Sequence, residues 1–136
     1  MDRLDDDALA IHVGEDVVKV RQEVRDRARA LGFSLIDQTK IVTAASELAR
    51  NILDYGGGGI VKLEAVESGS RRGLKLIFRD EGPGIADIEQ ALKDGYTTGS
   101  GLGLGLGGAK RLSNEFEIAS KPGEGTTVMI VRWKNP

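Results

Sequence analysis

Residues 74–84 read LKLIFRDEGPG, and this stretch combines an alternating apolar pattern, an aspartate and a glycine-containing turn. Every second residue is apolar up to Phe78, which predicts a strand with one buried face. The strand runs into Asp80, whose ionised carboxylate can accept a hydrogen bond from an amino group. Gly82 and Gly84 lack side chains and would let the backbone pass close to a flat ring. The alternative is an acidic surface turn, which proline and glycine form readily.

The remaining sequence predicts an α+β domain around this strand. Apolar residues at helical spacing indicate two helices, one over 17–31 and one from Ser34 to the glycine run at 56–59. Further strands are expected at 9–13, 60–67, 116–120 and 126–133, with a short helix near 88–92 and another over 104–112. These elements favour a two-layer α/β sandwich, in which a mixed, mostly antiparallel sheet carries its helices on one face. Because no repeat or interdomain linker is visible, we expect one domain over residues 1–136.

Composition excludes several kinds of protein. The chain has 136 residues, a net charge of −2 and no cysteine, so disulfides and thiolate metal sites are excluded and no nucleic-acid partner is expected. The acidic start of the chain is unlike a signal peptide, and no apolar run approaches the roughly 20 residues of a membrane helix. We therefore expect a cytoplasmic protein without a membrane partner. Glycine is abundant, with 19 residues, and seven of them between Gly95 and Gly108 indicate a backbone that moves or approaches a ligand closely.

A second polar cluster consists of Glu47 and Asn51. The two residues are four positions apart, so they share one face of the second predicted helix. An amide oxygen is a suitable ligand for Mg²⁺, and a neighbouring carboxylate can accept a proton from a hydroxyl group. The alternative is an ordinary solvated helix face.

The glycine-rich run from Gly101 to Gly108 opens the helix predicted near Leu104. Backbone N–H groups and the helix dipole at such a start favour an anion such as phosphate. The dinucleotide-binding pattern G-x-G-x-x-G can be placed on this run, but no strand precedes it, and a Walker P-loop lysine is absent. Phosphate binding here therefore requires a different architecture.

The fourth cluster is a tight hairpin turn at 123–126, which brings the Thr126 hydroxyl into the last strand. By itself it indicates only a turn. In chain order, however, the four clusters resemble the N box and the three glycine boxes of the GHKL (Bergerat) superfamily. That superfamily includes the ATP-binding domains of histidine kinases, type II topoisomerases and mismatch-repair ATPases, and the resemblance extends from Ser34 to the C-terminus.

A narrower resemblance links the chain to the bacterial anti-sigma-factor kinases that act in the stressosome. It rests on SELARNI at 46–52, DEGPGI at 80–85 and DGYTT at 94–98. It implies an ATP- and Mg²⁺-dependent serine/threonine kinase that phosphorylates a STAS-domain antagonist protein. It further implies partner switching, in which the released kinase binds and activates a PP2C-type phosphatase of a stress-response pathway.

The resemblance also implies which residues bind the nucleotide. Asp80 would accept the adenine amine, and Thr126 would support the same edge of the ring. Gly82 and Gly84 would let the ring lie close to the backbone. Contacts from the ATP lid and the phosphate-binding helix start are implied at Thr97, Thr98, Gly101, Leu102, Gly103, Leu104 and Gly105.

On the catalytic side, the resemblance implies that Asn51 holds Mg²⁺ and that Glu47 activates the attacking hydroxyl. The sequence assigns no role to Arg50 or Lys110. His12 is the one histidine of the chain and lies on the first predicted strand, so it is interpreted as structural. The phosphate acceptor is therefore expected on another protein.

Two other functions remain open. One is an ATP-binding regulatory module, similar to an anti-sigma factor, that sequesters a partner with little or no phosphotransfer. The other is an ATPase fragment related to topoisomerases, which would release phosphate without a protein acceptor.

Overall fold

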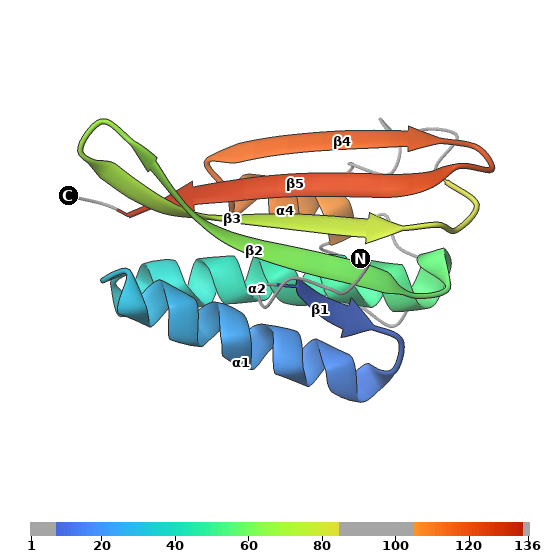
Figure 1. Cartoon of the computed structure of the whole chain (residues 1–136), viewed down its shortest axis with the longest axis horizontal. Helices are drawn as coiled ribbons and strands as arrows, with labels where there is room; N and C mark the ends of the chain where they lie inside the picture. Colours follow the sequence, from blue (N-terminus) through green and yellow to red (C-terminus); the bar gives the residue numbers. More distant parts are fainter. Residues whose placement is uncertain (1–7, 85–104, 135–136) are drawn as a thin grey trace, which may run out of the picture.

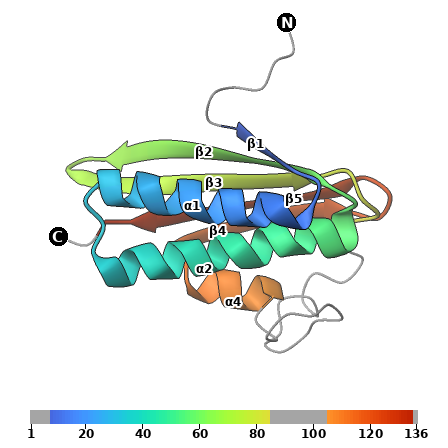
Figure 2. The same cartoon turned by 90° about the horizontal axis from the view of Figure 1, so that it is seen from below.

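Two layers make up the computed structural model of the chain, which describes residues 8–84 and 105–134. One layer is a five-stranded sheet, and helices lie on one of its faces (Figure 1). The α-helices of the described residues are α1 (Gly14–Ala30), α2 (Leu35–Asn51) and α4 (Gly105–Arg111). They lie side by side over the sheet, and α2 contacts both of the others (Figure 2). The predicted α+β sandwich with its helices on one face is confirmed.

The sheet is antiparallel at every pairing among the described strands. These are β1 (Ala8–Ile11), β2 (Gly59–Ser68), β3 (Arg71–Asp80), β4 (Glu115–Lys121) and β5 (Gly125–Trp133), in the order β1-β2-β3-β5-β4. β3 and β4 run in the same direction, but β5 lies between them, so they share no hydrogen bonds. The sheet that the sequence predicts as mixed and mostly antiparallel therefore has no parallel pairing in its described part.

The turn between β2 and β3 is shorter than the sequence indicates. A turn is expected over 68–73, whereas the two strands are joined at Gly69 and Ser70. Gly73 lies in β3 opposite Trp133 of β5, and its bare backbone packs against the indole ring. A Cβ built on Gly73 would lie 2.7 Å from Cε3 of the indole ring. Packing, rather than turn formation, is therefore the reason for glycine at this position.

The first strand ends at Ile11, two residues earlier than predicted. Asp16 Oδ2 accepts hydrogen bonds from the backbone N–H groups of His12 at 2.8 Å and Val13 at 3.1 Å. The Asp16 side chain therefore ties the backbone of both residues to the start of α1, where Val13 is the N-cap, and they do not extend β1. The same two bonds hold the pKa of Asp16 below its ordinary value.

Helix α2 has a well-defined start and end. The Ser34 hydroxyl caps the helix by accepting a hydrogen bond from the Asp37 backbone N–H at 3.1 Å, and Ser34 is the residue at which the sequence predicts this helix to begin. At its other end α2 continues into a π-helical turn, η1 (Ile52–Gly56), and the helix stops where Gly57 adopts a φ of 73°. The apolar residues that recur at helical spacing along α2 and into η1 are all buried: Ile41, Ala44, Ala45, Leu48 and Ile52.

The hydrophobic core lies between the helices and the sheet. Its fully buried side chains come from both layers and include Val20, Val24, Ile41, Leu63, Leu76 and Ile130. Their burial provides the main free energy that holds the helices on the sheet. Within the described ranges, no helix has the length and apolar character needed to cross a membrane.

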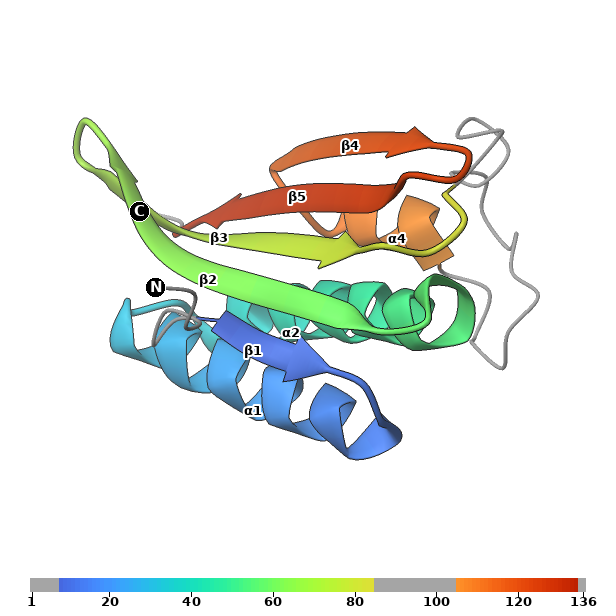
Figure 3. The same cartoon turned by 45° about the vertical axis from the view of Figure 1, so that its right-hand side comes forward.

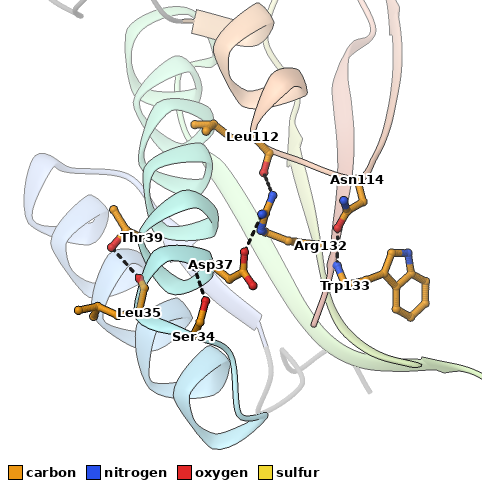
Figure 4. Close-up of polar contacts among 8 residues, drawn as sticks. All are labelled: Ser34, Leu35, Asp37, Thr39, Leu112, Asn114, Arg132 and Trp133. Carbon is orange, nitrogen blue, oxygen red and sulfur yellow. Dashed lines mark hydrogen bonds and ion pairs between the residues drawn. The ribbon is translucent and has the colours of Figure 1, made fainter. Parts of the chain in front are cut away.

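A buried ion pair fastens α2 and the end of α4 to the sheet (Figure 4). Arg132 of β5 donates from Nη2 to Asp37 Oδ1 at 2.7 Å and from Nη1 to the Leu112 carbonyl at 2.8 Å. Burial raises the pKa of Asp37, but the hydrogen bond and charge of Arg132 outweigh it, and the pKa lies below its ordinary value. Because Leu112 directly follows α4, one side chain fixes both helices relative to β5.

Candidate functional site

One row of opposed residues crosses the whole sheet: Ile11, Gly59, Asp80, Thr126 and Ser120. Opposed residues of neighbouring antiparallel strands point to the same face of a sheet. Ile11 is completely buried in the core, so this row faces the helical layer. The predicted adenine residues Asp80 and Thr126 are therefore direct neighbours on the inner face.

The row lies at the end of the sheet where α2 finishes, as Figure 3 shows for the end of β3, the start of β5 and η1. Asp80 and Gly56, the last residue of η1, are in close contact. A Cβ built on Gly56 would lie 2.6 Å from Asp80 Cγ. The end of the α2–η1 segment is thus packed directly against the Asp80 carboxylate.

The Asp80 carboxylate is partly exposed and already has one partner. Its Oδ1 accepts a hydrogen bond from the Gly82 backbone N–H at 2.9 Å. This bond closes a small turn after β3 and fixes the direction of the side chain. A carboxylate has several lone pairs, so Asp80 retains the capacity to accept further hydrogen bonds.

The glycines of this turn are required by contacts within the chain. A Cβ built on Gly82 would lie 2.7 Å from Gly56 Cα, and one on Gly84 would overlap the Lys121 carbonyl oxygen. Gly84 also has a φ of 79°, which side-chain-bearing residues rarely adopt. These contacts give both glycines a structural reason that is independent of the predicted approach of a ring.

Thr126 is hydrogen-bonded to a residue that the sequence analysis missed. Ser120 Oγ lies 2.7 Å from Thr126 Oγ1 and donates to the Gly125 carbonyl at 3.0 Å. Pairing the two strands outward from the turn at 121–125 would have placed Ser120 opposite Thr126. Gly56 was also missed, because its contact with Asp80 depends on how α2 packs on the sheet.

Glu47 and Asn51 occupy the last turns of α2, and both are partly buried. They lie beside Leu48 and Ile52, which are buried in the core. Asn51 is the final residue of α2, so only the η1 turn separates it from the contact with Asp80. Arg50, the residue before Asn51, is exposed.

The oxygen-bearing side chains at the end of α2 are suitable ligands for a magnesium ion that binds together with a phosphate group. Among the described residues there is no group of three or more His, Cys, Asp or Glu that could hold a metal by itself. Mg²⁺ commonly takes one or two protein oxygens and completes its coordination with phosphate and water. The amide oxygen of Asn51 is a suitable protein ligand of this kind.

Only part of the predicted glycine-rich segment is described. Gly105 begins α4 with a φ of 50° and is buried, as are the next four residues, whereas Lys110 is exposed. This small-residue helix packs against α2. The short helix expected near 88–92 lies outside the described residues, as do the predicted ligand contacts Thr97, Thr98, Gly101, Leu102, Gly103 and Leu104.

Comparison with known protein families assigns the chain to a family of ATP-binding domains. The family described as "Histidine kinase-, DNA gyrase B-, and HSP90-like ATPase" matches residues 36–136. The chain belongs to this family, as the order of the four clusters predicts. Membership of this ATPase family confirms the predicted use of ATP.

Two curated relatives define the group more narrowly. The serine/threonine-protein kinase RsbT of Bacillus subtilis (strain 168) is 46% identical over 129 residues, which cover 95% of this chain and 97% of RsbT. An anti-sigma F factor of Thermoanaerobacter sp. (strain X514) is 34% identical over 99 residues, 68% of each chain. The predicted enzyme class, a serine/threonine protein kinase of the GHKL type, is confirmed by the first of these relatives.

Two solved structures share the fold. The RsbU and RsbW domains of Rv1364c from Mycobacterium tuberculosis superpose with a TM-score of 0.60 at 24% identity, covering 95% of this chain and 33% of that one. The catalytic domain of the histidine kinase ThkA superposes with a TM-score of 0.53 at 16% identity, covering 93% and 95%. At these identities the likeness concerns the fold alone.

Proposed function

We propose that this chain transfers the γ-phosphate of ATP to a serine or threonine of a STAS-domain antagonist protein, with Mg²⁺ as the metal. The observation that carries the proposal is the direct pairing of Asp80 with Thr126 beside the end of α2. The similarity to RsbT over nearly the whole length of both chains supports the type of reaction.

Adenine recognition is assigned to the strand ends. Asp80 accepts a hydrogen bond from the exocyclic amine of the base, since its carboxylate is oriented by the Gly82 N–H and can accept further bonds. Thr126, opposite Asp80, supports the same edge of the base directly or through a water molecule. Gly82 and Gly84 leave room for the plane of the ring.

Phosphate binding and transfer are assigned to α2 and the glycine-rich segment. Bound Mg²⁺ would neutralise phosphate charge, with Asn51 as its protein ligand. Glu47, one turn earlier on α2, accepts the proton of the attacking hydroxyl. Backbone N–H groups at Gly101, Gly103 and Gly105 are proposed to hold the phosphate oxygens, with Thr97, Thr98, Leu102 and Leu104 as neighbouring contacts.

The proposal includes the biological setting that the resemblance implies. Phosphorylation of the STAS-domain protein releases the kinase, which then binds and activates a PP2C-type phosphatase of a stress response. The kinase acts as one domain over residues 1–136, in the cytoplasm, without nucleic acid or membrane as a partner.

A second candidate is a regulatory module that binds ATP but transfers little or no phosphate. The identity of 34% to an anti-sigma F factor is the observation that favours it. Glu47 next to Asn51 on the same helix supports the kinase instead, because simple sequestration needs no proton acceptor.

One experiment separates the candidates. The full chain is incubated with γ-labelled ATP, Mg²⁺ and a purified STAS-domain antagonist, and label is followed on protein and as free phosphate. Label on a serine or threonine of the antagonist supports the kinase. Bound ATP with no transfer supports the regulatory module, and rapid release of phosphate without labelled protein supports an ATPase.

A further inference from the structure

The contact between Ser120 and Thr126 joins the two strands of the last hairpin next to Asp80. Their hydroxyl oxygens are 2.7 Å apart, a short distance for hydroxyl groups, and both side chains are partly buried. Because Thr126 is also opposite Asp80, Ser120 is one strand removed from the carboxylate and on the same face of the sheet.

Counting protons gives this contact a direction. A serine hydroxyl has one hydrogen, and that of Ser120 is donated to the Gly125 carbonyl at 3.0 Å, a group that can only accept. Either hydroxyl could donate in the 2.7 Å contact, and we infer that Thr126 does, because the Ser120 hydrogen is directed to the Gly125 carbonyl. With its hydrogen used in this way, the Thr126 oxygen can only accept from a further partner.

Asp80 and Thr126 therefore present two hydrogen-bond acceptors side by side and no donor. This pattern matches the amino group at position 6 of adenine, which donates two hydrogens. Guanine and hypoxanthine have a carbonyl oxygen at that position, and its lone pairs would face the two acceptors. An edge of this kind favours adenine and also disfavours the other purines.

We propose that Ser120 is a positioning residue that fixes the Thr126 hydroxyl as an acceptor and thereby sets the preference for adenine over guanine nucleotides. This inference rests on the proposed function, since it requires that the base lies at Asp80. Ser120 acts through Thr126 and need not touch the nucleotide.

The test compares the affinities of ATP and GTP for the full chain, measured by titration calorimetry in the presence of Mg²⁺. In Ser120→Ala the Thr126 hydroxyl is free to rotate and to donate to a carbonyl group. We expect the ratio of ATP to GTP affinity to fall about tenfold, the size of one hydrogen bond. Ser120→Thr retains the hydroxyl, so its ratio should stay within about twofold of the original.

Thr126→Val shows whether Ser120 acts through Thr126. In this background the additional change Ser120→Ala should leave the ratio unaltered, because no hydroxyl remains to be oriented. A purely structural role of Ser120 would weaken ATP and GTP binding equally and leave the ratio unchanged in every background. If circular dichroism shows Ser120→Ala to be unfolded, Ser120→Cys retains the size with a much weaker acceptor and should also lower the ratio.

The outcomes distinguish this inference from the proposed function. An original chain that prefers ATP together with an unchanged ratio in Ser120→Ala overturns the role of Ser120 and leaves ATP binding in place. An original chain that binds neither nucleotide overturns both. A lower ratio in Ser120→Ala that Ser120→Thr restores supports the inference.

Discussion

Asp80 and Thr126 are directly opposed on β3 and β5, and the carboxylate of Asp80 packs against Gly56 at the end of the α2–η1 segment. The end of β3, the end of the α2–η1 segment and the start of β5 thus meet at one end of the sheet. Substitutions that alter one part of this arrangement, or of the core that supports it, should therefore have separate effects on binding, catalysis and stability.

Replacing Asp80 by Asn should remove nucleotide binding and leave the fold intact. The amide oxygen can still accept the hydrogen bond from the Gly82 N–H, but the amide nitrogen presents a donor to the adenine amine. We expect ATP affinity to fall at least about 100-fold, as for the loss of a bond to a charged acceptor. Calorimetric titration measures it, with the exposed neighbour change Glu81→Gln as the control. Equal affinity of Asp80→Asn and the original chain would remove Asp80 from the site.

Replacing Glu47 by Ala should separate binding from catalysis. ATP affinity should change less than about threefold, whereas phosphate transfer to the STAS-domain protein should fall at least about 100-fold, the usual contribution of a general base. Asp54→Asn, an exposed acidic residue on η1, is the control for loss of charge. Transfer by Glu47→Ala at close to the original rate would show that another group accepts the proton, or that none is needed.

The turn glycines offer a test of how closely the last hairpin approaches Asp80. Gly123 and Gly125 have similar φ values of 82° and 84°, but only a Cβ on Gly125 would overlap the Asp80 carbonyl oxygen. Gly123→Ala should cost only the backbone strain, about 1–2 kcal/mol. Gly125→Ala should cause a larger loss of stability, measured by thermal unfolding, and should also weaken ATP binding. Equal effects of the two changes would contradict the close approach.

The buried pair of Asp37 and Arg132 should make stability sensitive to acid. The pKa of Asp37 is lower in the folded chain than its ordinary value of 3.8, so its contribution is complete above that pH and is lost as the pH falls further. Arg132→Met leaves a buried carboxylate without its partner and should destabilise the chain by about 3 kcal/mol at neutral pH.

Unfolding by denaturant between pH 2.5 and 7 measures this effect. Asp37→Asn should lose part of the acid dependence of the original chain, while Asp54→Asn, on the surface of η1, should retain it. An acid dependence identical in all three chains would show that the Asp37 carboxylate does not contribute.

Local patterns were sufficient to predict much of the fold and part of the site. The alternation before Asp80 and the spacing of Glu47 and Asn51 depend only on the geometry of one strand or one helix. Relationships between distant segments were not predictable in this way. Asp37 and Arg132 are 95 positions apart, and nothing in either neighbourhood indicates the other.

Two further cases show why the rest required the structure. Ser120 enters the site only through the exact pairing of β4 and β5, which depends on the geometry of the turn between them. The sequence explains Gly84 by the close approach of a ring, and the structure adds a second reason, because its backbone lies against Lys121 of the last hairpin. A sequence pattern shows that a side chain is absent, but not which neighbour requires its absence.

The most direct test is a crystal structure of the chain with Mg²⁺ and a non-hydrolysable ATP analogue. The account predicts that the adenine amine lies about 3 Å from an Asp80 carboxylate oxygen, a normal hydrogen-bond distance, and that the metal is bound by Asn51. A nucleotide whose base lies away from Asp80, or whose metal is held without Asn51, would contradict it.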